Sequence, residues 1–348
     1  MKYRLGVAAL VLAVLLLALT VFNASWLAPE PKGALRLVAH RGVAQQFDHR
    51  GIDNDTCTAT RIEPPVHDRL ENTVRSIEDA ILQGADMVEV DIAPTKDGRI
   101  VLFHDWTVDC RTDGKGNTRD FTLAELQALD NGYGYTADGG KTFPFRGQRK
   151  YPIPTLEDGL RAAPRTPLIF NFKGKDPDEA DLLASALRAA GRDVESIGDA
   201  FYGDPAVVAR IKTHFPKAWA WSKQGIKACT KAYALQGWFG IVPQACKGET
   251  LAVPLNYQWL IPGWPDRTLA RMKAAKTRVL IVGPVGDDGP MGLNLPEQLG
   301  KIPRTFKGYV WVEDIWNLGP ALRSGRDIRN QAQIVASEAA LERRRERS

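Results

Sequence analysis

Short apolar runs alternate with amphipathic stretches along most of the chain. Runs rich in β-branched and aromatic residues predict strands, whereas apolar residues spaced three or four apart predict helices. The predicted strands are 35–40, 86–92, 99–104, 167–173, 196–202, 217–222, 250–257, 277–284 and 308–314, and the predicted helices are 72–84, 155–163, 178–191, 205–215 and 266–275. Strands interleaved with helices over about 250 residues favour an α/β fold, a TIM-type (β/α)8 barrel, over a doubly wound sheet.

One pair of predicted strands departs from this order. Only APTKDG joins them, which is too short for a crossover helix, so they should form a hairpin with Asp97 and Gly98 in its turn. Alternate side chains of a strand share a face, so Glu89 and Asp91 point the same way. The hairpin brings His104 roughly opposite Glu89. Two carboxylates on one buried face repel each other, so we expect a divalent cation between them.

Polar side chains also end other predicted strands. His40 and Arg41 end the first strand, and Asn171 and Lys173 share a face at the end of another. A barrel gathers such groups at the C-terminal ends of its strands. Histidine exchanges protons near neutral pH, arginine offers a planar fork to phosphate oxygens, and lysine offers a point charge. With His104 and a cation, these groups suit cleavage of a phosphate ester.

The N-terminus carries an uncharged 18-residue stretch, Leu5 to Phe22, which is long enough to cross a bilayer. Lys2 and Arg4 precede it, which favours an uncleaved anchor in the inner membrane with the remaining chain in the periplasm or extracellular space. The alternative is a signal peptide, whose cleavage would release a secreted protein. We therefore expect an anchor or signal segment (1–24), a linker (25–33), the barrel (34–330) and a charged C-terminal helix or tail (331–348).

Composition adds little to this prediction. The 348 residues are 44% hydrophobic and 25% charged, with a net charge of +5. The terminal ERRRERS is read as a solvated helical tail and not as a nucleic-acid or lipid-headgroup patch. We expect a small or lipid-derived phosphodiester substrate, contact with the membrane through the N-terminal helix, no nucleic acid and no obligate protein partner.

The four cysteines indicate an oxidising compartment and two disulfides. Sequence alone does not fix their connectivity. Pairing Cys57 with Cys110 and Cys229 with Cys246 would keep each bridge within one neighbourhood.

Several motifs, in order, resemble those of the glycerophosphodiester phosphodiesterase family, a metal-dependent β/α barrel related to the phosphatidylinositol phospholipases C. They are AHRG at 39–42, LENT at 70–73, EVDIAPTKDGRIVLFHD at 89–105, TDGKGNTRDFTLAEL at 112–126 and IPTLEDGL at 153–160. The resemblance is dense from Leu35 to about Lys173 and weak beyond. It implies a phosphoric diester hydrolase that converts glycerophosphodiesters to glycerol phosphate and an alcohol.

The resemblance also implies roles for individual residues. His40 and His104 match the acid/base pair, and Arg41 and Lys173 match groups that bind the substrate phosphate. The implied ligands of a Mg²⁺ or Ca²⁺ ion are Glu71, Glu89, Asp91 and Asn171. Asn171 departs from the family, because it stands where the family has a third acidic ligand. Glu313 is a candidate replacement, with capping of the last strand as the alternative.

A second departure is an insertion from Gln45 to Arg69, which should overhang the mouth of the barrel as a lid or specificity loop. A bridge between Cys57 and Cys110 would fasten it there. His49 and His67, within the insertion, are expected to be surface loop residues.

Two other functions remain open. One is phospholipase D-like or C-like hydrolysis of phospholipids or lysolipids, suggested by the membrane segment and by seven tryptophans in the second half of the chain. The other is a phosphodiester-binding barrel that has lost catalysis through Asn171.

Overall fold

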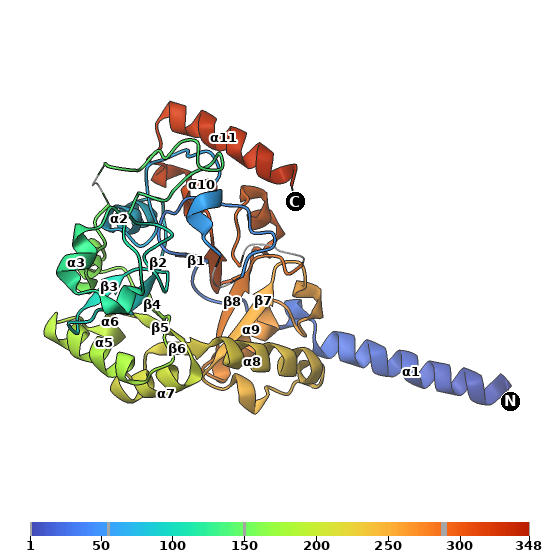
Figure 1. The fold of residues 1–348 in the computed structure, drawn as a ribbon. Helices are drawn as coiled ribbons and strands as arrows, with labels where there is room; N and C mark the ends of the chain where they lie inside the picture. The colour runs from blue at the N-terminus through green and yellow to red at the C-terminus, as the bar shows by residue number, and fades with distance from the viewer. Residues whose placement is uncertain (1, 54–55, 149–150, 287–290, 348) are drawn as a thin grey trace.

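A computed structural model describes residues 2–53, 56–148, 151–286 and 291–347. Within them the strands are β1 (Arg36–Ala39), β2 (Met87–Pro94), β3 (Ile100–Leu102), β4 (Leu168–Phe172), β5 (Ala200–Gly203), β6 (Trp219–Ser222), β7 (Thr250–Pro254), β8 (Arg278–Val282) and β9 (Tyr309–Val312). The α-helices are α1 (Lys2–Phe22), α2 (Val74–Leu82), α3 (Leu123–Ala128), α4 (Leu156–Ala162), α5 (Asp178–Ala189), α6 (Val194–Ile197), α7 (Pro205–His214), α8 (Lys223–Gln236), α9 (Asp266–Ala274), α10 (Ile315–Leu322) and α11 (Gln331–Arg345). Figure 1 shows helices packed around the strands and α1 projecting from the body beside α8 and α9.

Eight of the strands form a nearly closed parallel barrel. Their order is β6-β5-β4-β2-β1-β9-β8-β7, and every pairing along this path is parallel. The ninth strand, β3, pairs antiparallel with β2, with Ile92 opposite Leu102. The predicted TIM-type barrel and the predicted hairpin are therefore both confirmed.

The two faces of β2 have different surroundings. Val88, Val90 and Ile92 pack outward into the core between the strands and the helices. Met87 packs inward with side chains such as Trp311, and Glu89 and Asp91 on the same inner face are fully buried. The period-two pattern of this strand thus places two carboxylates inside the barrel.

The insertion after β1 folds over the C-terminal end of the barrel. It carries a short 3-10 helix (Thr58–Arg61), and Phe47 pairs with Ile62 across it. Ala59 and Ile62 pack against aromatic side chains of the long segment that follows β3, including Tyr135. The insertion and the segment after β3 thus share a small hydrophobic core.

Some predicted elements differ from the structure. The predicted strand 196–202 begins too early, because α6 occupies Val194–Ile197 and the strand starts at Ala200 after a left-handed Gly198. The predicted helical C-terminus forms α11, but it is not entirely solvated. Arg344 is buried and pairs with Glu63 of the insertion and with Asp314.

Candidate active site

His40 follows β1 and lies at the C-terminal end of the barrel. Its Nδ1 lies 2.6 Å from the Glu313 carboxylate, and its Nε2 lies 3.9 Å from Glu89. The ring also packs on Trp311, with centroids 5.4 Å apart. Burial acts to lower the pKa of His40, but the Glu313 carboxylate, helped by Glu89, outweighs it, so the pKa lies above its usual value.

Glu313 therefore lies beside a histidine. The same contact, working against burial, lowers the pKa of Glu313 to about 2. One of its oxygens is hydrogen-bonded to His40, which is the geometry of a carboxylate that orients an imidazole. This arrangement offers an explanation of Glu313 other than capping or replacement of the missing metal ligand.

The turn after His40 is built tightly. Arg41 adopts a left-handed backbone, with φ 59°, and its N–H donates to Glu89 at 3.0 Å. Gly42 has φ 76°, and a Cβ there would lie 2.5 Å from the Ser76 hydroxyl. Only glycine fits both the conformation and the close approach to α2. The turn thereby directs the Arg41 guanidinium to Asp91, with Nε 3.2 Å from a carboxylate oxygen.

Asp91 is the most heavily contacted carboxylate of the site. Its oxygens accept hydrogen bonds from the amides of Asn72 and Asn171, each at 3.0 Å, and Lys173 lies 3.7 Å away. Burial would raise its pKa, but His104, Arg41 and Lys173 together hold it well below the usual range. Asn72 thus acts as a support for Asp91.

Glu89 has the opposite environment. One of its oxygens is buried without a hydrogen-bond partner among the described residues. Burial and then the neighbouring Asp91 raise the pKa of Glu89 above its usual range. A buried, underpartnered oxygen beside another carboxylate is the environment that an added cation would relieve.

His104 follows β3, and its position depends on the hairpin. The Phe103 N–H donates to the Asp91 carbonyl at 3.0 Å, which brings the next residue to the carboxylate pair. His104 Nδ1 lies 2.5 Å from Asp105. Burial and then Arg41 lower the pKa of His104 to about 4, so the two active-site imidazoles are shifted in opposite directions.

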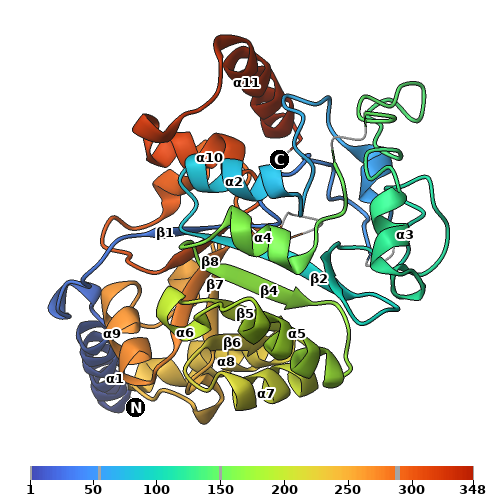
Figure 2. The ribbon, with the colours of Figure 1, turned by 90° about the vertical axis from the view of Figure 1, so that its left-hand side faces the viewer.

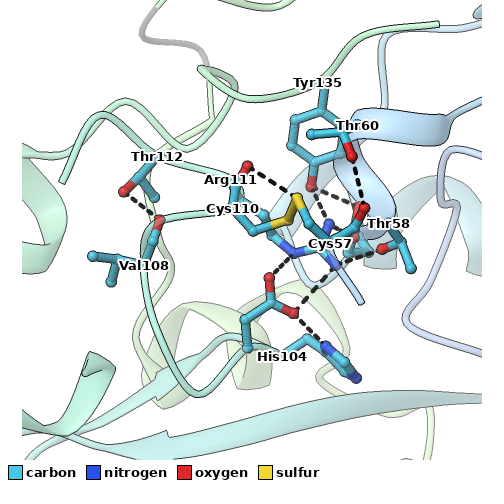
Figure 3. Close-up of a disulfide and its surroundings, with 11 residues drawn as sticks. Cys57, Thr58, Thr60, His104, Val108, Cys110, Arg111, Thr112 and Tyr135 are labelled. Carbon is cyan, nitrogen blue, oxygen red and sulfur yellow. Dashed lines mark hydrogen bonds and ion pairs between the residues drawn. A yellow bond between two sulfur atoms is a disulfide. The ribbon is translucent and has the colours of Figure 1, made fainter. Parts of the chain in front are cut away.

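Asp105 is held by Arg111, which the sequence analysis did not single out. Arg111 Nε lies 2.8 Å from Asp105, and the same guanidinium pairs with Glu71 and donates to Tyr135 at 2.9 Å. The Tyr135 hydroxyl in turn donates to Glu71 at 2.9 Å. Figure 3 shows Arg111 and Tyr135 above His104. The sequence signal that could have identified Arg111 is its charge and its position directly after Cys110, close to His104 and Asp105.

The insertion is fastened to this group by a disulfide. Cys57 is bonded to Cys110, and Arg111 donates to the Thr58 hydroxyl at 2.9 Å (Figure 3). The second bridge joins Cys229 to Cys246. Both favoured pairings are confirmed, and the first links the insertion directly to the support of His104.

The two histidines of the insertion differ in burial, since His67 is buried and His49 is partly exposed. His67 is 9% exposed, bonds to Gln45 and packs on Trp316, so its assignment as a surface residue is wrong. His49 stacks on Phe47 and, with it, lines the narrow cavity above His40. The insertion folds compactly and therefore buries the His67 side chain, which a loop of this composition would be expected to expose.

The charges of the site favour a hard cation. Its carboxylates are Glu71, Glu89, Asp91, Asp105 and Glu313, against the fixed positive charges of Arg41, Arg111 and Lys173. Among the described residues, no cluster of three or more His, Cys, Asp or Glu side chains is arranged as a metal site. Glu89, which has one buried oxygen without a hydrogen-bond partner among the described residues, is the hard oxygen donor best placed for a cation, with Asp91 and the Asn171 amide beside it. Both oxygens of Glu71 contact Arg111 or Tyr135, and both oxygens of Asp91 likewise have partners.

Part of the chain is similar to known proteins. Residues 40–190 match the Glycerophosphoryl diester phosphodiesterase family. Over 86 residues the chain is 45% identical to a glycerophosphodiester phosphodiesterase of Caldanaerobacter subterraneus, and over 125 residues it is 35% identical to mouse glycerophosphodiester phosphodiesterase 1. These matches cover 25% and 35% of this chain, and 32% and 34% of the relatives. The chain thus spans about a third of the length of these relatives.

The fold has solved counterparts. A phosphodiesterase of Oleispira antarctica, determined in complex with the product sn-glycerol-3-phosphate, superposes with a TM-score of 0.55 at 19% identity, covering 86% of this chain and 99% of that one. A glycerophosphodiester phosphodiesterase of Agrobacterium tumefaciens superposes with a TM-score of 0.55 at 20% identity, covering 84% and 100%. The segment that matches the Glycerophosphoryl diester phosphodiesterase family, residues 40–190, carries both histidines and the acidic pair.

Proposed function

We propose that the protein hydrolyses glycerophosphodiesters to glycerol phosphate and an alcohol, as a metal-assisted phosphoric diester hydrolase. The observation that carries this proposal is the meeting of His40 and His104 around one buried acidic pair. Both imidazoles lie close enough to Asp91 to lower its pKa. The family match and the named relatives support the same reaction.

Each histidine has one nitrogen for orientation and one for chemistry. Nδ1 of His40 is bound by Glu313, and Nδ1 of His104 is bound by Asp105. Nε2 of each ring is the nitrogen left for proton transfer. One histidine takes a proton from the nucleophile, either water or the neighbouring glycerol hydroxyl, and the other protonates the leaving oxygen. Their opposite pKa shifts suit such a pair.

The substrate phosphate would lie between Arg41 and Lys173. Both are only partly buried, with 14% and 23% of their side chains exposed, and both already face Asp91. Arginine can donate two parallel hydrogen bonds to phosphate oxygens. Glu89, Asp91 and Asn171 would hold a Mg²⁺ or Ca²⁺ ion, which when bound would offset charge on the phosphate oxygens.

The rest of the chain suggests an extracytoplasmic, tethered enzyme. Residues Arg4–Phe22 are long and apolar enough to cross a membrane, a test that a signal sequence also passes. Two disulfides support an oxidising compartment. We propose that residues 1–24 anchor the protein, 25–33 link the anchor to the barrel of residues 34–330, and 331–348 form the charged C-terminal helix or tail. Release of a secreted form by signal cleavage is the alternative.

The test is hydrolysis by single variants. His40→Ala and His104→Ala should each lower turnover of glycerophosphocholine and glycerophosphoethanolamine by about 10²-fold or more. His214→Ala is the matched control, because His214 lies on the outer helix α7 and pairs with Asp181. Wild-type turnover in the His40→Ala, His104→Ala double variant would refute the roles. Lysophosphatidylcholine assayed beside these substrates would reveal a phospholipase-like activity, and binding without turnover would reveal a phosphodiester-binding barrel.

A further inference from the structure

Exposed apolar side chains surround the end of α1. Two come from the short 3-10 helix η1 (Ser25–Leu27), and the others come from the end of α8 and from η4 (Gly237–Phe239) with the residues that follow. This basal apolar rim consists of Trp26, Leu27, Leu235, Trp238, Phe239 and Ile241. Trp26 is 78% exposed and Phe239 is 67% exposed, so the rim is not part of the core.

The end of α1 is attached directly to this rim. The Asn23 amide donates to the Trp238 carbonyl at 2.8 Å, and the Phe22 ring lies under the Arg271 guanidinium at 5.3 Å. Arg271 also donates to Asn23 and to the Gly237 carbonyl. The apolar helix therefore ends at the rim, where a spanning helix would pass from hydrocarbon to headgroups.

The rim lies at the base of the barrel, on the opposite end from the histidines. The Ser25 hydroxyl of η1 accepts a hydrogen bond from the Asp266 N–H at 2.9 Å, and Asp266 lines a cavity whose walls include the first residues of β6 and β9, at the N-terminal ends of these strands. Figure 2 shows α1 beside α9 at the lower left, with α3 at the opposite side of the body. The catalytic mouth and the rim thus face different directions.

A large basic cavity opens on the same base. Its volume is about 1230 Å³, and its walls include Trp219 and Tyr309 at the first positions of β6 and β9. The charged lining residues are Lys32, Lys212, Lys217, Lys273, Lys276, Arg278 and Lys307, against Glu30 and Asp266. Pro29 to Lys32, which follow η1, form part of the wall. The cavity therefore adjoins the chain that leaves the apolar helix.

We propose that the base of the barrel docks on an anionic lipid bilayer. The basal apolar rim lies in the interface, where tryptophan and other aromatic side chains are favoured, and the cavity presents its positive charges to anionic headgroups. The occupant is a bilayer because the rim is continuous with the apolar helix and the cavity next to it is cationic. The catalytic mouth then opens to the aqueous phase, which, under the proposed function, favours soluble glycerophosphodiesters over lipids of the same membrane.

Spin labelling of the full chain tests the orientation. All four cysteines of the chain are in disulfides, so one added cysteine gives one labelled site. Phe239→Cys places the label on the rim, and Lys115→Cys, an exposed residue of the segment after β3, is the matched control. In phosphatidylcholine nanodiscs containing phosphatidylglycerol, the label at 239 should collide more with oxygen than with a water-soluble nickel complex, and the label at 115 should do the reverse. Equal aqueous access at both positions would overturn the proposal.

A charge variant tests the anionic part separately. The variant combines Lys217→Glu and Lys273→Glu, two exposed residues that line the cavity and not the site of His40 and His104. It should reduce lipid immersion of the label at 239 when phosphatidylglycerol is present. Hydrolysis of soluble glycerophosphocholine should stay unchanged. If immersion is the same with and without phosphatidylglycerol, and in the charge variant, the anionic docking is wrong. Because label access is measured without turnover, this result is independent of the proposed function.

Discussion

Arg111 is the residue whose removal should damage both stability and catalysis. Its side chain is 3% exposed, pairs with Glu71 and Asp105, and bonds to Tyr135 and Thr58. In Arg111→Met, the methionine keeps much of the volume and removes the charge, leaving the two largely buried carboxylates of Glu71 and Asp105 without their cation. Breaking one buried pair costs about 3–5 kcal/mol, so we expect a loss near the upper end, about 5 kcal/mol.

The catalytic effect follows from the position of Asp105. Burial raises the pKa of Asp105, and Arg111, the main opposing group, holds it below its usual range. Without Arg111 that pKa rises and Asp105 is no longer fixed beside His104. Turnover should fall by about 10²-fold, as for loss of a positioned proton-transfer group. Arg111→Lys retains the charge but not the planar fork, so it should recover stability better than turnover.

Urea unfolding and steady-state hydrolysis measure the two effects. Arg161→Met is the matched control, because Arg161 is 71% exposed and pairs with Asp158 only on the surface of α4. Exposed pairs of this kind contribute about 0–1 kcal/mol. If Arg111→Met unfolds within about 1 kcal/mol of the wild type and keeps its turnover, Arg111 does not support the site.

Two further predictions concern pH and metal. Burial lowers the pKa of His67 from 6.5 to about 4, so between these values the unfolded chain binds the proton first. About 3 kcal/mol of the unfolding free energy, present above pH 6.5, should therefore be lost as the pH falls toward 4. Urea unfolding measured across this range should show this dependence on pH in the wild type and not in His67→Gln. The same dependence in both proteins would contradict the burial of a neutral His67. Asn171→Glu should bind Mg²⁺ or Ca²⁺ at least about tenfold more tightly than Asn171→Gln in calorimetric titrations, because it restores a carboxylate ligand. Equal affinities would exclude Asn171 from the donor set.

The sequence by itself determined the features that depend on neighbouring residues. Alternation along β2 places Glu89 and Asp91 on one face, and the short link after it forces the hairpin that delivers His104. The order of strands and helices likewise predicts the barrel, which collects His40 and Lys173 at one end. These conclusions hold because strand periodicity and loop length are local properties of a chain.

Only the tertiary structure decided which groups from distant parts of the chain meet. Glu313 reaches His40 across 273 residues, and Arg111 joins Glu71 to Asp105. The burial of His67 depends on packing against Trp316, and the position of the basal apolar rim depends on where η4 meets the end of α1. Such contacts are selected by the closure of the barrel and by the packing of its loops. Their energies come from burial and charge pairing in three dimensions, which no local pattern encodes.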